Sequence, residues 1–282
     1  MTEQARFAEL VLGFEGLAIL RAWMLDNSTV KARAEEILDI AARIEQEPWS
    51  NPLSYEESTV TDGYAQWADT YDDPGNPILL AEEPAVHQIL ARYPVATALD
   101  AACGTGRHTE YLTSLGHQVT GVDATPEMLE LAAAKVPGAT FETADLTALP
   151  FPDGHFDIAV CSLALTHSPD LGPPISELAR VLRPGGHLVI SDVHPFDVVL
   201  SVQGVFRRKR GGRGFVRNYV HLTSDYLNAF QQAGLSVLQC KEPRWEDREI
   251  ATIAFSEKMP DLIDTAVKGL PIAIVWELQK DA

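Results

Sequence analysis

Short apolar segments alternate with helix-like segments from about residue 84 to the end of the chain. Five of these segments are rich in β-branched residues and bounded by Gly, Pro or Asp, which is typical of buried strands. The predicted strands are Ala96–Ala101, His117–Asp123, Ala139–Asp145, Phe156–Leu165 and Gly186–His194. The helices predicted between them are Arg107–Leu115, one capped by Thr125, and Ile175–Leu182. The pattern indicates an α/β fold with a parallel sheet covered on both faces.

The pattern changes after the fifth predicted strand. A flexible loop rich in Gly and Arg leads to a helix that begins at Thr223 and ends at Gly234. Two further strands are predicted at Leu235–Trp245 and Pro271–Lys280. We expect residues 195–222 to form a lid insertion in the main domain.

The first sixty residues have a helical pattern of their own. Apolar residues recur at helical spacing between Phe7 and Ile44, and Asp26-Asn27-Ser28 divides them into two helices, the second capped near Ser28. A Pro-rich segment, Pro48–Ser54, follows. We therefore expect residues 1–60 to form a helical extension or cap, and residues 61–282 the main domain. The extension is interpreted as a lid, a homodimer surface or only a packing element, and the sequence leaves these open.

Composition narrows the classes of ligand. The chain has 282 residues and a formal net charge of -18, which repels nucleic acid. Its cysteines, Cys103, Cys161 and Cys240, lack the spacing of a structural zinc site or a disulfide framework, so we expect no metal. No signal-like segment starts the chain, and the apolar runs are too short to span a bilayer. These features predict a soluble cytoplasmic protein with a small-molecule substrate, and neither nucleic acid nor membrane as a ligand.

The sharpest local signal is a strand that runs into a glycine turn and then a helix. Leu99–Gly106 reads Leu-Asp-Ala-Ala-Cys-Gly-Thr-Gly, and glycines in such a turn let the backbone approach a ligand at a helix N-terminus. Asp123 ends the next strand, 19 positions after Gly104. At that spacing a carboxylate can bind both hydroxyls of a ribose.

Two cofactor classes fit this turn. Dinucleotide sites favour a third glycine, but that position is Thr109 here. Asp100, just before the turn, suits an ammonium group better than a pyrophosphate. S-adenosylmethionine has a ribose and an ammonium group and no phosphate, so the residues favour it over NAD.

Five ordered motifs carry a family resemblance over roughly residues 60–280. The chain resembles the class I S-adenosylmethionine-dependent methyltransferases, in particular the ubiquinone/menaquinone-biosynthesis type that acts on small molecules. The matching segments are Leu99–Gly106, Gly121–Asp123, Thr143–Phe151, Phe156–Cys161 and Glu177–Leu188. The resemblance implies a Rossmann-like, seven-stranded, mostly parallel sheet with an antiparallel last strand, preceded here by the helical extension. Ala102 departs from the family, which usually has Gly at this position.

The resemblance also implies roles for individual residues at the cofactor. Asp123 is expected to bind the ribose, and Asp145 the adenine amino group, with Leu146 and Met128 against the ring. Asp100 and the Gly104 backbone are expected to hold the methionine part. The other residues expected at the cofactor are Ala102, Gly106, Ala124, Ser162 and Tyr71.

Two histidines are candidate general bases, because histidine titrates near neutral pH. His167 follows the fourth predicted strand and His194 ends the fifth, at the edge of the sheet where ligands bind in this architecture. Either residue is equally compatible with a structural role. The remaining histidines of this region, His108, His117, His155 and His187, are predicted to be surface residues.

Two further segments are candidate substrate contacts. Tyr64, Trp67 and Tyr71 share one side of a predicted helix, and they resemble the stretch that covers the cofactor in related enzymes. An aromatic core stripe is the alternative. Residues 207–217 contain six cations and no acid, so Arg207 and Arg208 are candidates for an anionic substrate group. A solvated loop is the alternative there.

The sequence thus predicts methyl transfer from S-adenosylmethionine to an O-, N- or C-nucleophile of a small molecule, with release of S-adenosylhomocysteine. Two alternatives stay open: an enzyme that uses the same cofactor for a non-methyl reaction such as a cyclisation, and a non-catalytic cofactor-binding partner protein.

Overall fold

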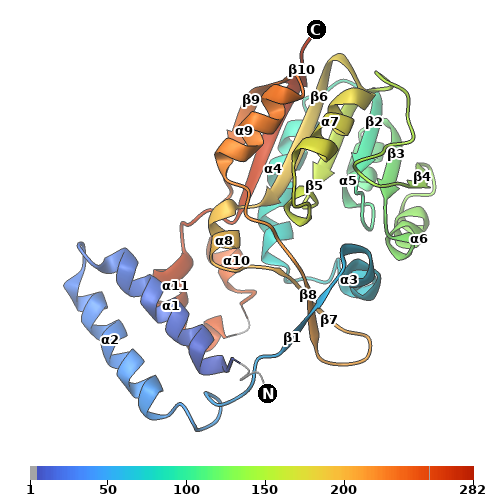
Figure 1. Cartoon of the computed structure of the whole chain (residues 1–282). Helices are drawn as coiled ribbons and strands as arrows, with labels where there is room; N and C mark the ends of the chain where they lie inside the picture. Colours follow the sequence, from blue (N-terminus) through green and yellow to red (C-terminus); the bar gives the residue numbers. More distant parts are fainter. Residues whose placement is uncertain (1–4, 254) are drawn as a thin grey trace. The chain divides into compact units, whose positions relative to one another are not determined.

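The structure, a computed structural model, describes residues 5–253 and 255–282 (Figure 1). The chain forms two compact units. One contains the described residues up to Glu56 together with Arg244–Leu270, and the other contains Glu57–Pro243 and Pro271–Ala282.

Two long helices begin the first unit. Helix α1 (Phe7–Ala22) and helix α2 (Asn27–Ala42) pack against each other, and the Asp26 side chain caps α2 by accepting from the Ser28 and Thr29 amides. The predicted pair of N-terminal helices is confirmed. The unit also contains α10 (Asp247–Ile250), η3 (Ser256–Lys258) and α11 (Pro260–Val267), while β1 (Tyr55–Ser58) spans the boundary between units.

The segment Arg244–Leu270 joins the N-terminal helices in this unit, which the sequence analysis did not anticipate. Arg21 on α1 donates to the carbonyl oxygens of Thr265 and Lys268, at 3.0 and 2.8 Å. The predicted strand Leu235–Trp245 correspondingly ends early, at Lys241.

The second unit is built on a seven-stranded sheet with the order β4-β3-β2-β5-β6-β10-β9. Strands β2 to β6 pair in parallel, whereas β10, the last strand of the chain, runs antiparallel to both of its neighbours. The predicted fold class is therefore confirmed. The strands are β2 (Thr97–Ala101), β3 (Gln118–Asp123), β4 (Thr140–Thr143), β5 (Phe156–Ser162), β6 (Leu182–Val193), β9 (Leu235–Lys241) and β10 (Ala273–Lys280).

Helices α4 (Pro77–Leu90) and α5 (Arg107–Ser114) pack on one face of this sheet, and α7 (Gly172–Val181) and α9 (Thr223–Gln232) pack on the other (Figure 1). The remaining helices of this unit are α3 (Val60–Trp67), η1 (Ala68–Thr70), α6 (Pro126–Lys135), η2 (Leu165–His167) and α8 (Pro195–Val199).

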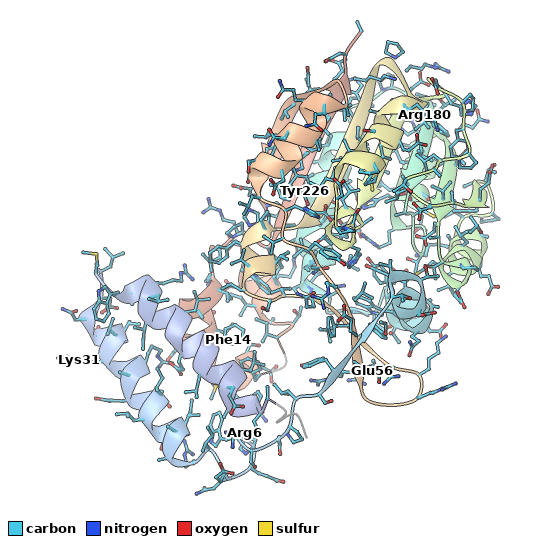
Figure 2. The ribbon with its side chains drawn as sticks, viewed as in Figure 1. Arg6, Phe14, Lys31, Glu56, Arg180 and Tyr226 are labelled. Atoms are coloured by element: carbon cyan, nitrogen blue, oxygen red, sulfur yellow. The ribbon has the colours of Figure 1, made fainter. Side chains whose placement is uncertain are left out.

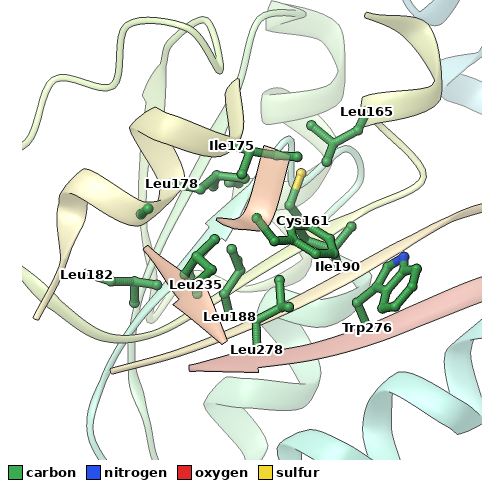
Figure 3. Packing of buried hydrophobic residues seen from close by; sticks show 14 of the residues in the cluster. Cys161, Leu165, Ile175, Leu178, Leu182, Leu188, Ile190, Leu235, Trp276 and Leu278 are labelled. Carbon is green, nitrogen blue, oxygen red and sulfur yellow. The ribbon is translucent and has the colours of Figure 1, made fainter. Parts of the chain in front are cut away.

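Alternating side chains of the central strands separate two apolar cores. On β5, Ile158 and Val160 pack with α4 and α5, whereas Ala159 and Cys161 pack with α7 and α9. Figure 3 shows the second core, where Ile175 and Leu178 of α7 meet Cys161 and Ile190 of the sheet. Burial on both faces explains why these strands are continuous apolar runs. The same packing fixes the strand ends that carry the polar residues of the site.

The Gly- and Arg-rich segment is a β-hairpin, not the flexible loop expected from its glycines. Strands β7 (Gly204–Arg207) and β8 (Arg213–Val216) pair antiparallel. Gly211 and Gly212 have φ angles of +90° and +82°, a conformation that suits a tight turn. The prediction was wrong because it rested on the charged residues and glycines of this segment. It gave no weight to Phe206 and Val216, two apolar side chains that are buried in the hairpin.

Candidate cofactor and substrate site

The glycine turn between β2 and α5 is tightly packed at one of its glycines and open at the other. Gly104 has φ +53° and Gly106, the N-cap of α5, has φ +81°. A Cβ on Gly106 would lie 3.1 Å from the Ala132 side chain of α6, so this glycine allows close helix packing. A Cβ on Gly104 would meet no atom within 4 Å, so open space lies beside this turn.

Ala102 adopts a left-handed conformation, which glycine adopts more readily than alanine. Its φ is +55°, which brings the Cβ of an L-residue close to the following carbonyl oxygen. Strain of this kind persists where the surrounding structure holds the backbone in place. The alanine therefore keeps the shape of the turn at the expense of some stability.

The carboxylate of Asp123, at the end of β3, closes this turn. Its Oδ2 accepts from the Gly104 amide at 2.9 Å and its Oδ1 accepts from the Thr125 amide at 2.8 Å. Burial raises the pKa of Asp123, while the two amide hydrogen bonds oppose that shift. Each oxygen retains a lone pair for a further donor, so the group can accept two hydroxyls.

A cavity of about 270 Å³ lies at the carboxyl ends of the parallel strands, and many of the predicted cofactor residues line it. Those residues are Tyr71, Ala102, Gly104, Asp123, Ala124, Asp145, Leu146 and Ser162. Its described lining residues include two carboxylates and no Lys or Arg. A cavity of that charge disfavours a pyrophosphate and suits a ribose and an adenine. The Ser162 hydroxyl is buried there without a partner among the described residues, as expected of a group that binds a ligand.

Three predicted cofactor residues lie outside this lining. Asp100 is 1% exposed and accepts a hydrogen bond from Thr109 Oγ1 at 2.6 Å. Gly106 packs against α6, as described above. Met128 is buried in a cluster with Tyr71 and Leu163. These residues support the cavity wall from behind.

The segment that carries Asp145 and Leu146 is tied to α7. The Glu177 carboxylate accepts from the Leu149 amide at 2.9 Å. Arg180, labelled in Figure 2, pairs with Glu177 and donates to the carbonyl oxygens of Leu149 and Phe151. These bonds fix the connection between β4 and β5 at the edge of the cavity.

A second cavity of about 620 Å³ adjoins the first, and four residues line both: Tyr64, Tyr71, Leu163 and His167. We call these four residues the shared wall. Of the predicted substrate residues, Tyr64, Trp67 and Arg207 line the larger cavity, and Arg208 does not. Leu163 has φ +55°, so the shared wall also contains a strained residue.

A hydrogen bond joins two side chains of the shared wall. His167 Nδ1 lies 2.8 Å from the Arg217 carbonyl oxygen, which can only accept, so Nδ1 carries the proton. In the neutral ring, Nε2 is then an acceptor, and the Tyr64 hydroxyl donates to it across 2.7 Å. Burial lowers the pKa of His167 and raises that of Tyr64 well above its ordinary value. The pair is therefore a neutral imidazole and a neutral phenol at pH 7.

His194, the other candidate base, lines neither cavity. Its Nδ1 accepts from the Phe196 amide at 3.1 Å and caps α8, and its Nε2 lies 3.2 Å from Glu242 Oε1. Both ring nitrogens are therefore engaged in bonds that fix local structure.

The element that carries His167 is held by a buried carboxylate that sequence reasoning missed. Asp192, near the end of β6, accepts from the Thr166 amide at 3.0 Å and from the Tyr226 hydroxyl at 2.8 Å. Tyr226 reaches it from α9 (Figure 2). Burial raises the pKa of Asp192 to about 7. The only sequence signal was a polar residue at the end of a strand.

Two histidines predicted at the surface are buried. His108 is 3% exposed and its Nε2 lies 3.1 Å from the Glu82 carboxylate, while His117 is 5% exposed and accepts from the Ala96 amide. The prediction was wrong because partners on α4 and before β2 each bond one nitrogen of these rings inside the fold. His155 is exposed, as predicted, and His187 is half-buried.

Within residues 5–253 and 255–282, no helix combines the length and apolar character that crossing a bilayer requires. No cluster of three or more His, Cys, Asp or Glu side chains that could hold a metal ion occurs in the same residues.

The chain is similar to known methyltransferases. A methyltransferase-domain family matches residues 99–190. Over 142 residues the chain is 30% identical to malonyl-[acyl-carrier protein] O-methyltransferase of Yersinia pestis, covering 50% of this chain and 52% of that protein. Over 103 residues it is 39% identical to 2-methyl-6-phytyl-1,4-hydroquinone methyltransferase of Synechocystis, covering 35% and 32%. The chain thus spans about half the length, or less, of these curated relatives.

A solved structure extends the similarity to a larger part of the chain. The S-adenosylmethionine-dependent methyltransferase from Mesorhizobium loti is 26% identical, with a TM-score of 0.56, covering 71% of this chain and 98% of that one. The domain match, this structure and the strand order with an antiparallel last strand agree. The chain therefore contains a methyltransferase domain at residues 99–190, within a fold like that of S-adenosylmethionine-dependent methyltransferases.

Proposed function

We propose that this protein transfers a methyl group from S-adenosylmethionine to a small-molecule acceptor. The observation that carries the proposal is the shared wall between two cavities. Methyl transfer needs the cofactor and the acceptor side by side in a site that excludes water. Adjoining cavities with a common wall meet that requirement.

The residues of the smaller cavity fit the cofactor. Asp123 would accept the two ribose hydroxyls, and Asp145 and Leu146 would bind the adenine. Tyr71 and the turn from Ala102 to Gly104 would contact the methionine part, with Asp100 behind it. When bound, S-adenosylmethionine supplies a methyl group on a positively charged sulfur and leaves as S-adenosylhomocysteine.

The chain's own contribution to the chemistry is removal of a proton from the acceptor. As the acceptor loses its proton to the Tyr64 oxygen, the Tyr64 hydroxyl proton moves to His167 Nε2. The resulting imidazolium keeps its Nδ1 bond to the Arg217 carbonyl oxygen. The lowered pKa of His167 leaves the ring neutral and ready to accept that proton at pH 7. We therefore assign the general base to His167, with Tyr64 as the relay, and a structural role to His194.

The larger cavity is proposed to hold the acceptor. Trp67 and Arg207 line it, and Arg208 is within the adjoining turn. Two relatives are named for malonyl-[acyl-carrier protein] and for a hydroquinone. An acceptor with a hydroxyl, as on a hydroquinone, is the kind for which a base in the shared wall is useful.

Expectations about partners stay predictions. A homodimer through α1 and α2 is consistent with Leu20, Met24 and Leu25, which are 75%, 90% and 89% exposed. Sedimentation equilibrium of the wild type and Met24→Ser tests it, because a dimer through this surface should weaken in the variant. The absence of nucleic acid ligands rests on the acidic composition, and a cytoplasmic location stays a prediction.

A turnover assay tests the proposed function. The protein is incubated with S-adenosylmethionine carrying a deuterated methyl group and a fractionated cell extract, and products are analysed by mass spectrometry. We expect S-adenosylhomocysteine and an extract component that has gained the labelled methyl group. Binding without turnover in every fraction would contradict methyl transfer, and a product formed without label would indicate a non-methyl reaction.

A further inference from the structure

The larger cavity has two buried polar side-chain atoms that no described residue pairs. Asn218 is 6% exposed and Thr166 is 2% exposed, and both line this cavity. Asn218 Oδ1 and Thr166 Oγ1 have no hydrogen-bond partner among the described residues. Buried polar atoms in folded proteins are nearly always paired, so a molecule in the cavity is expected to supply the partner.

The orientation of the Asn218 amide decides what that partner must be. Asn218 Nδ2 lies 3.1 Å from the Val202 carbonyl oxygen, which can only accept, so the amide nitrogen occupies that position. The Asn218 backbone amide is also fixed, since it donates to Gln203 Oε1 at 2.6 Å. The unpaired atom is therefore an acceptor, and it requires an N–H or O–H group on the ligand.

Stacked rings give the same cavity a flat apolar side. Trp67 stacks on Phe206 with centroids 5.9 Å apart and planes inclined by 24°. Tyr64 stacks on Trp67 at 5.7 Å and 23°. All three residues line the cavity. Parallel aromatic faces favour a flat, conjugated molecule over a bulky or branched one.

The hairpin adds positive charge to the cavity. Arg207 and Arg213 are directly opposite in the register of β7 and β8, and both line the cavity. Asp73 is the one carboxylate among its described lining residues. A local excess of positive charge in a chain of net charge -18 favours an anionic ligand group at this position.

We propose that the larger cavity binds a flat conjugated molecule with a carboxylate held at Arg207 and Arg213 and a hydroxyl or amine that donates to Asn218. This inference rests on the proposed function, because it specifies the acceptor class of the same site. Asn218 is a specificity-determining residue in this account. It selects ligands that carry a donor, because a ligand without one leaves the acceptor buried and unpaired.

Three matched probes separate the features of the ligand. They are 6-hydroxy-2-naphthoate, which has both groups, 2-naphthoate, which lacks the donor, and 2-naphthol, which lacks the carboxylate. Calorimetry measures their binding to the full chain saturated with S-adenosylhomocysteine. We expect 6-hydroxy-2-naphthoate to bind about 5- to 100-fold more tightly than 2-naphthoate, the effect of leaving a buried acceptor unpaired. We also expect its affinity, unlike that of 2-naphthol, to fall as salt rises.

Variants then assign each preference to a residue. Asn218→Leu should abolish the preference for 6-hydroxy-2-naphthoate over 2-naphthoate, whereas Asn218→Asp should retain it. Arg207→Ser, which leaves Arg213 in place, should weaken the salt dependence, whereas Arg210→Ser, in the turn of the same hairpin and outside the cavity lining, should retain it in full. Affinity for S-adenosylhomocysteine reports in each variant that the fold is intact.

The outcomes separate this inference from the proposed function. If S-adenosylhomocysteine binds and the three probes bind equally or not at all, the assigned substrate class is wrong and the cofactor site stands. If Asn218→Leu keeps the preference for the hydroxyl, the role of Asn218 is wrong. If S-adenosylhomocysteine itself does not bind the wild type, the proposed function fails first.

Discussion

The Tyr64 hydroxyl oxygen lies 2.7 Å from Nε2 of His167, although the two residues are 103 positions apart in the chain. Tyr64 comes from α3, before the first strand of the main sheet, and His167 comes from η2, after β5. Both side chains line both cavities. This hydrogen bond therefore connects a helix that precedes the main sheet in the chain with the segment that follows β5. It lies where an acceptor would meet the cofactor.

Removing either member of this pair should slow methyl transfer. We expect His167→Gln and Tyr64→Phe each to lower kcat about 10²–10⁴-fold, the usual contribution of a positioned general base. His194→Gln is the matched control. It should cost about 0.5–2 kcal/mol of stability through loss of the α8 cap, with kcat retained. Steady-state kinetics with the acceptor from the turnover assay measures these effects, and a loss confined to the His194 variant would reverse the assignment.

The pH profile of kcat/KM should report His167. Burial lowers the pKa of this ring below 6.5, and proton transfer needs the neutral form. Activity should therefore be constant near neutral pH and fall on the acid side, with a midpoint below 6.5. In Tyr64→Phe the remaining activity should no longer show this fall on the acid side, because the variant lacks the hydroxyl that connects the acceptor to His167. A midpoint above 6.5 would show that a different group titrates.

Asp192→Asn should remove a pH-dependent penalty on folding. The pKa of Asp192 is raised from 3.8 to about 7, so between these values the folded protein holds a proton that the unfolded chain releases. The stability contributed by the protonated group is present below pH 3.8 and is lost as pH rises through about 7. An asparagine side chain neither gains nor loses a proton in this pH range, so the variant lacks this pH dependence.

Urea unfolding across this range checks that sign. Relative to wild type, the variant should gain stability as pH rises from about 4 to about 7, and the difference should level off above that. A difference that is the same at both ends of the range would mean that Asp192 titrates normally.

Ala102→Gly and Gly104→Ala, both in the glycine turn, should change the stability of the protein in opposite directions. Ala102→Gly should stabilise the protein by up to about 1 kcal/mol, because glycine adopts φ +55° without the Cβ contact, partly offset by a more flexible unfolded chain. Gly104→Ala, two residues away with φ +53° and open space for a Cβ, should destabilise it by about 1–2 kcal/mol. Denaturant midpoints measure both, and a destabilising Ala102→Gly would show that the alanine methyl makes a contact that outweighs the strain.

Local patterns in the sequence predicted the sheet and much of the smaller cavity. The apolar run of β5 marks a strand buried on both faces, because Ile158 and Ala159 face different cores. Asp123 could be placed because the spacing from a glycine turn to the end of the next parallel strand is nearly fixed by the βαβ unit. Such features depend on neighbours in sequence and on regular strand geometry.

Contacts between distant segments could not be predicted in this way. Nothing near His167 indicates that Tyr64 is its partner, and nothing near His108 indicates that Glu82 bonds its ring. Asn218 follows a run of charged residues in the sequence. The role of its Oδ1 atom as an acceptor depends on the Val202 carbonyl oxygen, which fixes the orientation of the side-chain amide. These roles arise from tertiary packing, which a single sequence does not display.

The most direct measurement is calorimetry of S-adenosylhomocysteine binding to the wild type and to Asp123→Ala. The account predicts that the wild type binds, and that the variant binds more weakly by about 1.5–3 kcal/mol, because two hydrogen bonds to a charged carboxylate are lost. Asp157→Ala, a carboxylate outside both cavities, should keep wild-type affinity. Unchanged affinity in Asp123→Ala, or binding of NAD as tight as that of S-adenosylhomocysteine, would contradict the account.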